Sequence, residues 1–368
     1  MCGICGVMRL VPPGPAAPRI TEDAVVRMRD AMVHRGPDDE GLFVADGVAL
    51  GHRRLSIIDL SGSRQPMANP DESVWLTYNG EVYNFQDLRA ELDARGVTFR
   101  TKGDTEVVLR AYETWGDDAV TRLRGMFTFG IWDGPRRRLL LARDPLGIKP
   151  LYYTRTDDGL FLFASEIRAL LTWPGVRAEL DHDALWDFLG QRYVPGPRTM
   201  FRGIQKLPGG HLLVADADGV SVRRYWDVPL DGGTWAPDQC VRTFRDLLAD
   251  SVRREMVSDV PLGVFLSGGI DSTTVTALMA SMTDDPVRSF CVGYASTAGV
   301  NERPYARMAA ERFGTAHREV EIGLEEFWTL LPEAIHSRTR EARWLPASPA
   351  SASARGSQPS ARVRSIRR

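Results

Sequence analysis

Apolar and polar positions alternate over residues 1 to about 215 in a way that predicts short strands mixed with amphipathic helices. The apolar runs Met126–Trp132, Leu139–Ala142 and Phe161–Ala164 predict strands. A charged turn, Asp133–Arg138, separates the first two and makes them neighbours in an antiparallel sheet.

Helical spacing appears in two stretches between such strands. One carries Phe85, Leu88 and Leu92 and is followed by Gly96. The other runs from Val107 to Trp115, with Gly116 as its stop. The mixture favours sheets covered by helices, with mostly local, antiparallel pairing.

Beyond residue 226 the pattern changes. Residues 226–237 hold two prolines and two glycines without apolar periodicity, which predicts a linker. Helices over 238–256, 272–282, 302–313 and 324–335 then alternate with strands over 260–266, 287–292 and 316–322. Regular strand–helix alternation predicts a doubly wound parallel sheet.

The alternation stops after His336. The remaining residues are rich in Arg, Ser, Ala and Pro and predict a disordered tail with no further packed strand. Three parallel strands alone leave a long edge and an uncovered apolar face. We therefore expect a domain cut short, by truncation or by a reading-frame shift near residue 336.

Composition adds three exclusions. The 368 residues carry 46 basic and 48 acidic side chains, which gives no case for nucleic-acid binding. No apolar run approaches the roughly 18 residues of a membrane span. Four cysteines are too few for a disulfide scaffold. We expect a soluble cytoplasmic enzyme with no membrane partner.

The amino terminus carries candidate chemistry. A small residue at position 2 permits removal of Met1, which leaves Cys2 with a thiol nucleophile and a free α-amine on one residue. The amine has an ordinary pKa near 8 and can act as an internal base. Cys2 and Cys5 form an isolated C-x-x-C pair, which does not predict a metal site, and Cys5 is expected in the core.

Four further segments concentrate polar side chains near predicted element ends: His34–Asp38, Gly51–Asp59, Tyr78–Asn84 and Lys102–Glu106. In these segments Arg54 precedes an expected apolar strand, Asn79-Gly80 follows the expected strand 74–77, and Asp104 is an expected helix N-cap. Taken singly, each has a structural explanation: a surface charge, a tight turn and a cap.

Taken together with Cys2, these segments resemble the glutaminase domain of class II, N-terminal-nucleophile glutamine amidotransferases. The resemblance implies a four-layer helix–sheet–sheet–helix fold with Cys2 as nucleophile. It implies an oxyanion hole from the Asn79 side chain and the Gly80 N–H, an Arg54 that grips the glutamine α-carboxylate, and carboxylates at Glu81 and Asp104 for the α-ammonium. The implied glutamine-binding set is Arg54, Leu55, Ser56, Ile57, Ile58, Asn79, Gly80, Glu81 and Asp104.

A second motif follows the linker. Ser267-Gly268-Gly269-Ile270-Asp271-Ser272 sits between a predicted strand and a helix, where backbone N–H groups can hold an anion. It lacks the Gly-Lys-[Ser/Thr] ending of a Walker A loop. It resembles the pyrophosphate loop of ATP-pyrophosphatases.

A glutaminase domain followed by this loop resembles glutamine-hydrolysing asparagine synthetases. The segments Arg143–Tyr152, Ala164–Ile167 and Ser289–Gly293 also match that family. The implied ATP-binding residues are Leu266, Ser267, Gly268, Gly269, Asp271, Ser272 and Val292, with Asp271 next to Mg²⁺. The implied reaction activates aspartate as β-aspartyl-AMP, which ammonia from glutamine then attacks.

The expected organisation is α/β: a glutaminase domain over 1–225, the linker, an incomplete doubly wound nucleotide-binding domain over 238–335, and the tail 336–368. The family's later Ser-Gly-Glu-Gly-x-Asp-Glu segment does not follow Ala334. The expected partners are glutamine, aspartate and ATP, and a homodimer is the assembly we consider. Three alternatives stay open: a glutaminase with a non-functional synthetase remnant, an amidotransferase for another carboxylate, and a chain too short to fold.

Overall fold

The structure is a computed structural model that describes residues 1–10, 19–230, 232–295, 301–336 and 364–365. The chain forms two compact units, one over residues 1–229 and one that begins at Leu230. Each unit is described separately below.

The first unit contains two six-stranded antiparallel sheets. The strand order in the first sheet is β10-β8-β9-β1-β3-β2. Its strands are β1 (Gly3–Arg9), β2 (Asp39–Ala45), β3 (Val48–Arg54), β8 (Tyr152–Arg155), β9 (Leu160–Ala164) and β10 (Ile204–Lys206).

The second sheet has the order β12-β11-β7-β6-β5-β4. Its strands are β4 (Met67–Ala68), β5 (Val74–Val82), β6 (Gly125–Asp133), β7 (Arg138–Arg143), β11 (His211–Asp216) and β12 (Gly219–Arg224). The predicted pairing of the apolar runs at 126–132 and 139–142 is confirmed as the β6–β7 ladder.

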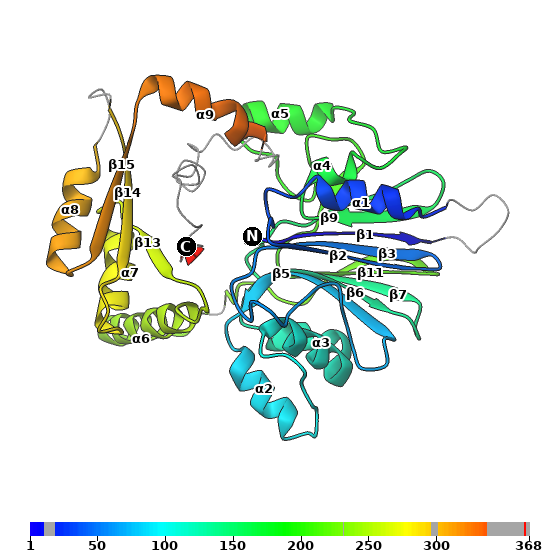
Figure 1. The fold of residues 1–368 in the computed structure, drawn as a ribbon, viewed down its shortest axis with the longest axis horizontal. Helices are drawn as coiled ribbons and strands as arrows, with labels where there is room; N and C mark the ends of the chain where they lie inside the picture. Colours follow the sequence, from blue (N-terminus) through cyan, green and yellow to red (C-terminus); the bar gives the residue numbers. More distant parts are fainter. Residues whose placement is uncertain (11–18, 231, 296–300, 337–363, 366–368) are drawn as a thin grey trace. The chain divides into compact units, whose positions relative to one another are not determined.

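The two sheets pack face to face, and helices cover their outer faces (Figure 1). The inter-sheet core includes Ile4, Leu50, Leu141 and Phe163, all fully buried. Helices α1 (Glu22–Asp30) and α4 (Ile167–Leu170) cover the first sheet, α3 (Asp104–Trp115) covers the second, and α2 (Phe85–Asp93) packs on α3. The unit also contains the 3-10 helix η1 (Gly116–Arg122) and α5 (His182–Gln191). The expected four-layer fold is confirmed.

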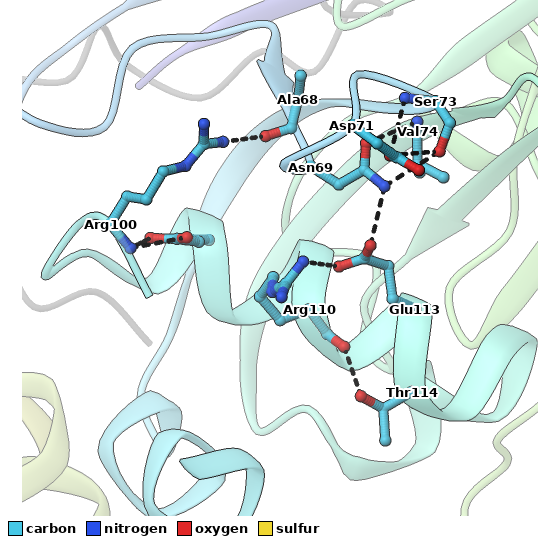
Figure 2. Close-up of polar contacts among 10 residues, drawn as sticks. Ala68, Asn69, Asp71, Ser73, Val74, Arg100, Arg110, Glu113 and Thr114 are labelled. Carbon is cyan, nitrogen blue, oxygen red and sulfur yellow. Dashed lines mark hydrogen bonds and ion pairs between the residues drawn. The ribbon is translucent and has the colours of Figure 1, made fainter. Parts of the chain in front are cut away.

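Asn69 fixes α3 against the second sheet (Figure 2). Its Oδ1 accepts the Val74 N–H at 3.0 Å, at the start of β5, and its Nδ2 donates to the Glu113 carboxylate on α3 at 2.9 Å. Asp104 is the first residue of α3, so holding the helix in place also helps to fix the Asp104 carboxylate relative to β5.

The second unit contains a parallel sheet with the order β15-β14-β13-β16. Its elements are α6 (Pro237–Glu255), β13 (Leu262–Phe265), α7 (Ile270–Ser281), β14 (Arg288–Tyr294), α8 (Arg303–Arg312), β15 (Ala316–Ile322), α9 (Leu324–His336) and β16 (Arg364–Ser365). One core cluster joins Val252 of α6 to Val264 and Met279, and a second joins Leu266 to α8. The predicted parallel strand–helix alternation is confirmed.

The prediction that no strand follows His336 is wrong for Arg364–Ser365, whose backbone pairs with the edge of β13. An unpaired strand edge offers backbone donors and acceptors to any extended segment, which accounts for this pairing. Of the rest of the predicted tail, His336 ends α9, and the other residues lie outside the described ranges. Among the helices of the described ranges, none is long and apolar enough to cross a membrane.

Candidate active site

Cys2 precedes β1, and its side chain lies on the face of the first sheet that meets the second. Side chains alternate along a strand, and Ile4, two residues further on, packs in the inter-sheet core. The Leu55 N–H donates to Cys2 Sγ at 3.4 Å, and Sγ lies 3.7 Å from the Leu55 carbonyl oxygen. The half-buried thiol therefore lies against the loop that follows β3.

The amino end of the chain lies in surroundings that favour an uncharged amine. Burial lowers the pKa of the Met1 amino group to about 5; the Cys2 thiol opposes this shift, and the cations of Arg35 and Lys149 add to it. The Met1 amine is therefore a free base at neutral pH. By contrast, burial raises the pKa of the Cys5 thiol to about 12, so Cys5 stays protonated in the core.

Asn79 and Gly80 lie within β5, which runs on to Val82. The Asn79 side chain is buried, and its Nδ2 has no hydrogen-bond partner among the described residues. Asn79 shares the inter-sheet face of β5 with Thr77, whose Oγ1 contacts the β3 residue His52. The unused donor therefore points into the layer that also holds the Cys2 side chain.

The Gly80 N–H lies on the edge of β5 that faces away from β6. On this edge, the Tyr78 N–H donates to Gln65 Oε1 at 2.7 Å, and the Val82 N–H donates to Asp104 Oδ2 at 3.0 Å. Alternation along an antiparallel strand places the Gly80 N–H between them. A Cβ at Gly80 would lie 2.6 Å from the Met126 carbonyl oxygen, so only glycine fits against β6 here.

Arg54 ends β3, and the following loop folds around its guanidinium. Arg54 Nη2 donates to the Asp59 carbonyl at 2.6 Å and to the Ile58 carbonyl at 3.4 Å, and Nη1 donates to the Leu60 carbonyl at 3.2 Å. The Asp59 carboxylate in turn accepts the Lys102 N–H at 3.1 Å. These bonds tie the arginine and its loop to the start of α3.

Asp104 is buried where α3 meets the β5 edge. Its Oδ2 accepts the Tyr78 hydroxyl at 2.6 Å and the Val82 N–H at 3.0 Å. Burial raises the pKa of Asp104, although those two bonds oppose the shift. Glu81 is also buried, on the inter-sheet face of β5. Arg54, Glu81 and Asp104 thus supply one cation and two carboxylates at the end of β3, on β5 and at the start of α3. A zwitterionic amino acid requires a complement of this kind.

In the second unit, the Ser267–Ser272 segment comprises the end of the turn after β13 and the first three residues of α7. Ser267 Oγ and Ser272 Oγ lie 3.0 Å apart, and the Ser267 N–H donates to Ser272 Oγ at 3.2 Å. Gly268 has a φ of +77°, and a Cβ there would lie 2.4 Å from the Tyr305 Cβ on α8. Asp271 stands exposed in the first turn of α7.

The other two expected ATP residues flank this turn differently. The Leu266 side chain is buried in the cluster with Ala306, so it packs on α8. Val292 lies on β14, and continuing the β13–β14 register places it beside Ser267. The turn thus stands at the carboxyl end of a parallel strand, where α/β sheets bind ligands.

Comparison with known proteins gives matches over both units. Residues 1–226 match the family described as "Glutamine amidotransferase domain", and residues 243–354 match "Asparagine synthase". The chain is 39% identical over 325 residues to "Asparagine synthetase [glutamine-hydrolyzing] 3" of Bacillus subtilis, covering 84% of this chain and 53% of the relative. It is 32% identical over 355 residues to "Putative asparagine synthetase [glutamine-hydrolyzing] 2" of Methanocaldococcus jannaschii, covering 90% of this chain and 67% of the relative.

The chain belongs to the family of glutamine-hydrolysing asparagine synthetases. It spans about half the length of most of the curated relatives it matches. A further relative is "Amidase chyE" of Penicillium rubens, which is 33% identical over 371 residues, covering 94% of this chain and 53% of the relative.

Three local expectations about this asparagine synthetase family member are wrong. Residues 55–58 form a loop, because the Ser56 N–H donates to the Asp38 carboxylate and the Ile58 carbonyl turns toward Arg54. Asn79-Gly80 lies inside a strand, because β6 packs directly on Gly80. Asp104 is the first residue of α3 and Gly103 is its N-cap, since the Asp104 carboxylate turns away to bind Tyr78 and Val82.

Three residues outside the predicted site form a hydrogen-bonded group that reaches Cys2 through Arg35. Arg35 donates from Nε to the Cys2 carbonyl at 2.9 Å and from Nη1 to Glu166 at 2.9 Å. His34 Nε2 lies 2.9 Å from the same Glu166 oxygen. The polar segments at 34–38 and 164–167 were visible in the sequence, but their 131-residue separation hid the contact between them.

Proposed function

We propose that the first unit hydrolyses glutamine at Cys2 after removal of Met1. The Cys2 α-amine takes the proton of the Cys2 thiol, and the resulting thiolate attacks the side-chain carbonyl carbon of glutamine. The amine then passes the proton to the leaving nitrogen. The C–N bond breaks, ammonia leaves, and a γ-glutamyl thioester remains. Water then attacks this thioester, releasing glutamate and restoring the thiol.

The observation that carries this proposal is the buried Asn79 Nδ2, which has no hydrogen-bond partner among the described residues and points into the same inter-sheet layer as the Cys2 side chain. A buried donor without a partner costs free energy, and it is expected where a negative oxygen forms during reaction. We assign the developing oxyanion to Asn79 Nδ2 and the Gly80 N–H. Arg54 binds the substrate α-carboxylate, Glu81 and Asp104 bind the α-ammonium, and the loop 55–58 lines the site.

A glutamine-hydrolysis assay with a matched cysteine control tests this proposal. We expect glutamate release by the unchanged chain, and loss of it in Cys2→Ala. Cys240→Ala should have no effect, because Cys240 is an exposed cysteine in the second unit. Retained activity in Cys2→Ala would contradict the assignment.

We further propose that the second unit binds ATP at the Ser267–Ser272 turn and activates aspartate as β-aspartyl-AMP for attack by ammonia. The N–H groups and hydroxyls of this turn suit the phosphate oxygens. The described residues contain no group of three or more His, Cys, Asp or Glu side chains able to hold a metal. Mg²⁺ would therefore be held by the ATP phosphates together with Asp271, as is common for this ion.

AMP release from ATP, with ammonium chloride supplied and with or without aspartate, tests the second half. Added ammonia bypasses Cys2. Aspartate-dependent AMP supports asparagine synthesis by this chain. AMP that depends on another carboxylate favours a different acceptor, an alternative that the similarity to an amidase supports. Glutamine hydrolysis without any AMP leaves a glutaminase alone.

We also propose the cytoplasm as the compartment and a homodimer as the assembly. The reactants of this chemistry are cytoplasmic metabolites. Light scattering on the purified chain tests the assembly, and a monomeric mass would contradict it.

A further inference from the structure

Glu166 stands at the centre of a buried polar group behind the nucleophile. Its Oε1 accepts a hydrogen bond from Arg35 Nη1 at 2.9 Å and also lies 2.9 Å from His34 Nε2. The Arg35 and Glu166 side chains are only 6% and 5% exposed. Arg35 uses its Nε for the Cys2 carbonyl oxygen, so one guanidinium joins the glutamate to the nucleophile's backbone.

Ser165, the residue before Glu166, is hydrogen-bonded to Ile4 of β1. The Ser165 N–H donates to the Ile4 carbonyl at 2.8 Å, and the Ile4 N–H donates to Ser165 Oγ at 3.1 Å. Residues 165–166 thus fix the start of β1 at two points: Ile4 directly, and Cys2 through Arg35.

Such anchoring matters for a nucleophile at a chain end. Once Met1 is removed, Cys2 has no preceding residue, so its position depends on β1 and on its own carbonyl group. A displacement of about 1 Å in a reacting group can cost about 100-fold in rate. The Arg35 bond to the Cys2 carbonyl limits that displacement.

We infer that Glu166 is a positioning residue for the Cys2 nucleophile, which it holds in place through Arg35. This inference rests on the proposed glutamine hydrolysis. Glu166 touches no substrate; it fixes the Arg35 guanidinium and balances its charge in a buried site.

The charges around this group fit that role. Burial alone would raise the pKa of Glu166, but the bonds from His34 and the charge of Arg35 outweigh it and hold that pKa below its ordinary value. Glu166 is therefore ionised at neutral pH. The groups that act on the adjacent amino end are Cys2, Arg35, Lys149 and Asp38. Losing the Glu166 charge leaves the Arg35 cation uncompensated beside that amine.

The test is Glu166→Gln, which keeps the shape and removes the charge. We expect kcat for glutamine hydrolysis to fall about 10-fold to 100-fold with KM unchanged, because the groups that bind glutamine lie elsewhere. The acid limb of the kcat profile should move to lower pH, since the uncompensated Arg35 cation favours the neutral amine. Asp133→Asn is the matched control: Asp133 is a buried carboxylate bound by Tyr112 at the far end of β6, and it should change neither value.

A double variant shows whether Glu166 acts through Arg35. Arg35→Lys alone should lower kcat to a similar extent, and adding Glu166→Gln should cause little further loss. Additive losses would overturn the inference. So would an unchanged kcat and pH profile in Glu166→Gln, or equal changes in kcat and KM.

A labelling measurement covers the case in which these variants fold poorly. A glutamine-shaped diazoketone should label Cys2 more slowly in Glu166→Gln, whereas iodoacetamide should label it at an unchanged rate. Parallel slowing of both reagents indicates general disruption and overturns the inference. If the unchanged chain does not hydrolyse glutamine, or Cys2→Ala does, the proposed function fails and the inference fails with it. If only Glu166→Gln behaves as wild type, the inference alone fails.

Discussion

Replacing Asn79 by leucine separates the proposed catalytic role of this side chain from its contribution to stability. Leucine has nearly the same shape but no donor. The Asn79 Nδ2 is buried and has no partner among the described residues. Leaving such a donor unsatisfied costs about 1–3 kcal/mol in the folded state, and a side chain without it avoids that cost.

Asn79→Leu is therefore expected to raise the stability of the first unit. One kcal/mol shifts the melting temperature of a unit of this size by about 2–4 °C. We expect a rise of at least about 2 °C. The same change should lower kcat for glutamine hydrolysis about 100-fold to 1,000-fold, because it removes one of the two proposed oxyanion donors.

Thr128→Val is the matched control. Thr128 lies directly opposite Asn79 on β6, is fully buried, and its Oγ1 also has no partner among the described residues. Valine should raise stability similarly and leave glutamine hydrolysis unchanged. Calorimetry and a glutamate-release assay on both variants give the two readouts. A lower melting temperature for Asn79→Leu would mean that Nδ2 is already satisfied, and retained activity would refute its oxyanion role.

Three other changes test separate parts of the molecule. Asp104→Asn should raise KM for glutamine about 10-fold to 100-fold, since a bond to a charged group contributes about 1.5–3 kcal/mol; an unchanged KM would remove Asp104 from the site. Burial raises the pKa of Asp104, so this carboxylate takes up its proton above the ordinary aspartate range. As the pH is lowered, KM of the wild-type chain should therefore begin to rise above that range. His52 is buried beside Thr77 with its pKa lowered to about 3, chiefly by burial and then by Arg54. Only the unfolded state then takes up this proton between about pH 6.5 and 3, so stability should fall by about 2 kcal/mol at pH 5; urea titrations in which His52→Asn shows the same pH slope would contradict this. Gly268→Ala should destabilise the second unit by at least about 1–2 kcal/mol, because its φ is positive and the new Cβ would also meet Tyr305, with glutamine hydrolysis unaffected; limited proteolysis gives the readout, and a variant as resistant as wild type would contradict it.

Periodic apolar patterns predicted most of the elements, because burial on one face of a strand or helix imposes that period on the sequence. The apolar runs at 126–132 and 139–142 form the paired strands β6 and β7, and the residues spaced as Phe85, Leu88 and Leu92 lie on helix α2, as predicted. The change to strand–helix alternation after residue 237 likewise predicted the parallel sheet.

Features decided by contacts between distant residues were not predictable from local pattern. Asn79-Gly80 has the composition of a turn, yet the close approach of Phe127 keeps it in a strand. The apolar residues Leu55, Ile57 and Ile58 suggested a strand, but the carbonyls of the 58–60 backbone turn toward Arg54. The pairing of β16 with β13 likewise has no local signal in an arginine-rich segment.

The measurement that tests the central claim most directly is identification of the covalent intermediate. The chain is mixed with excess glutamine, quenched rapidly in acid, digested, and analysed by mass spectrometry at each of its four cysteines, Cys2, Cys5, Cys240 and Cys291. The account predicts a γ-glutamyl thioester on a peptide that begins with Cys2, and none on the other three. Glutamate production with no adduct at Cys2, or with the adduct on another cysteine, would contradict it.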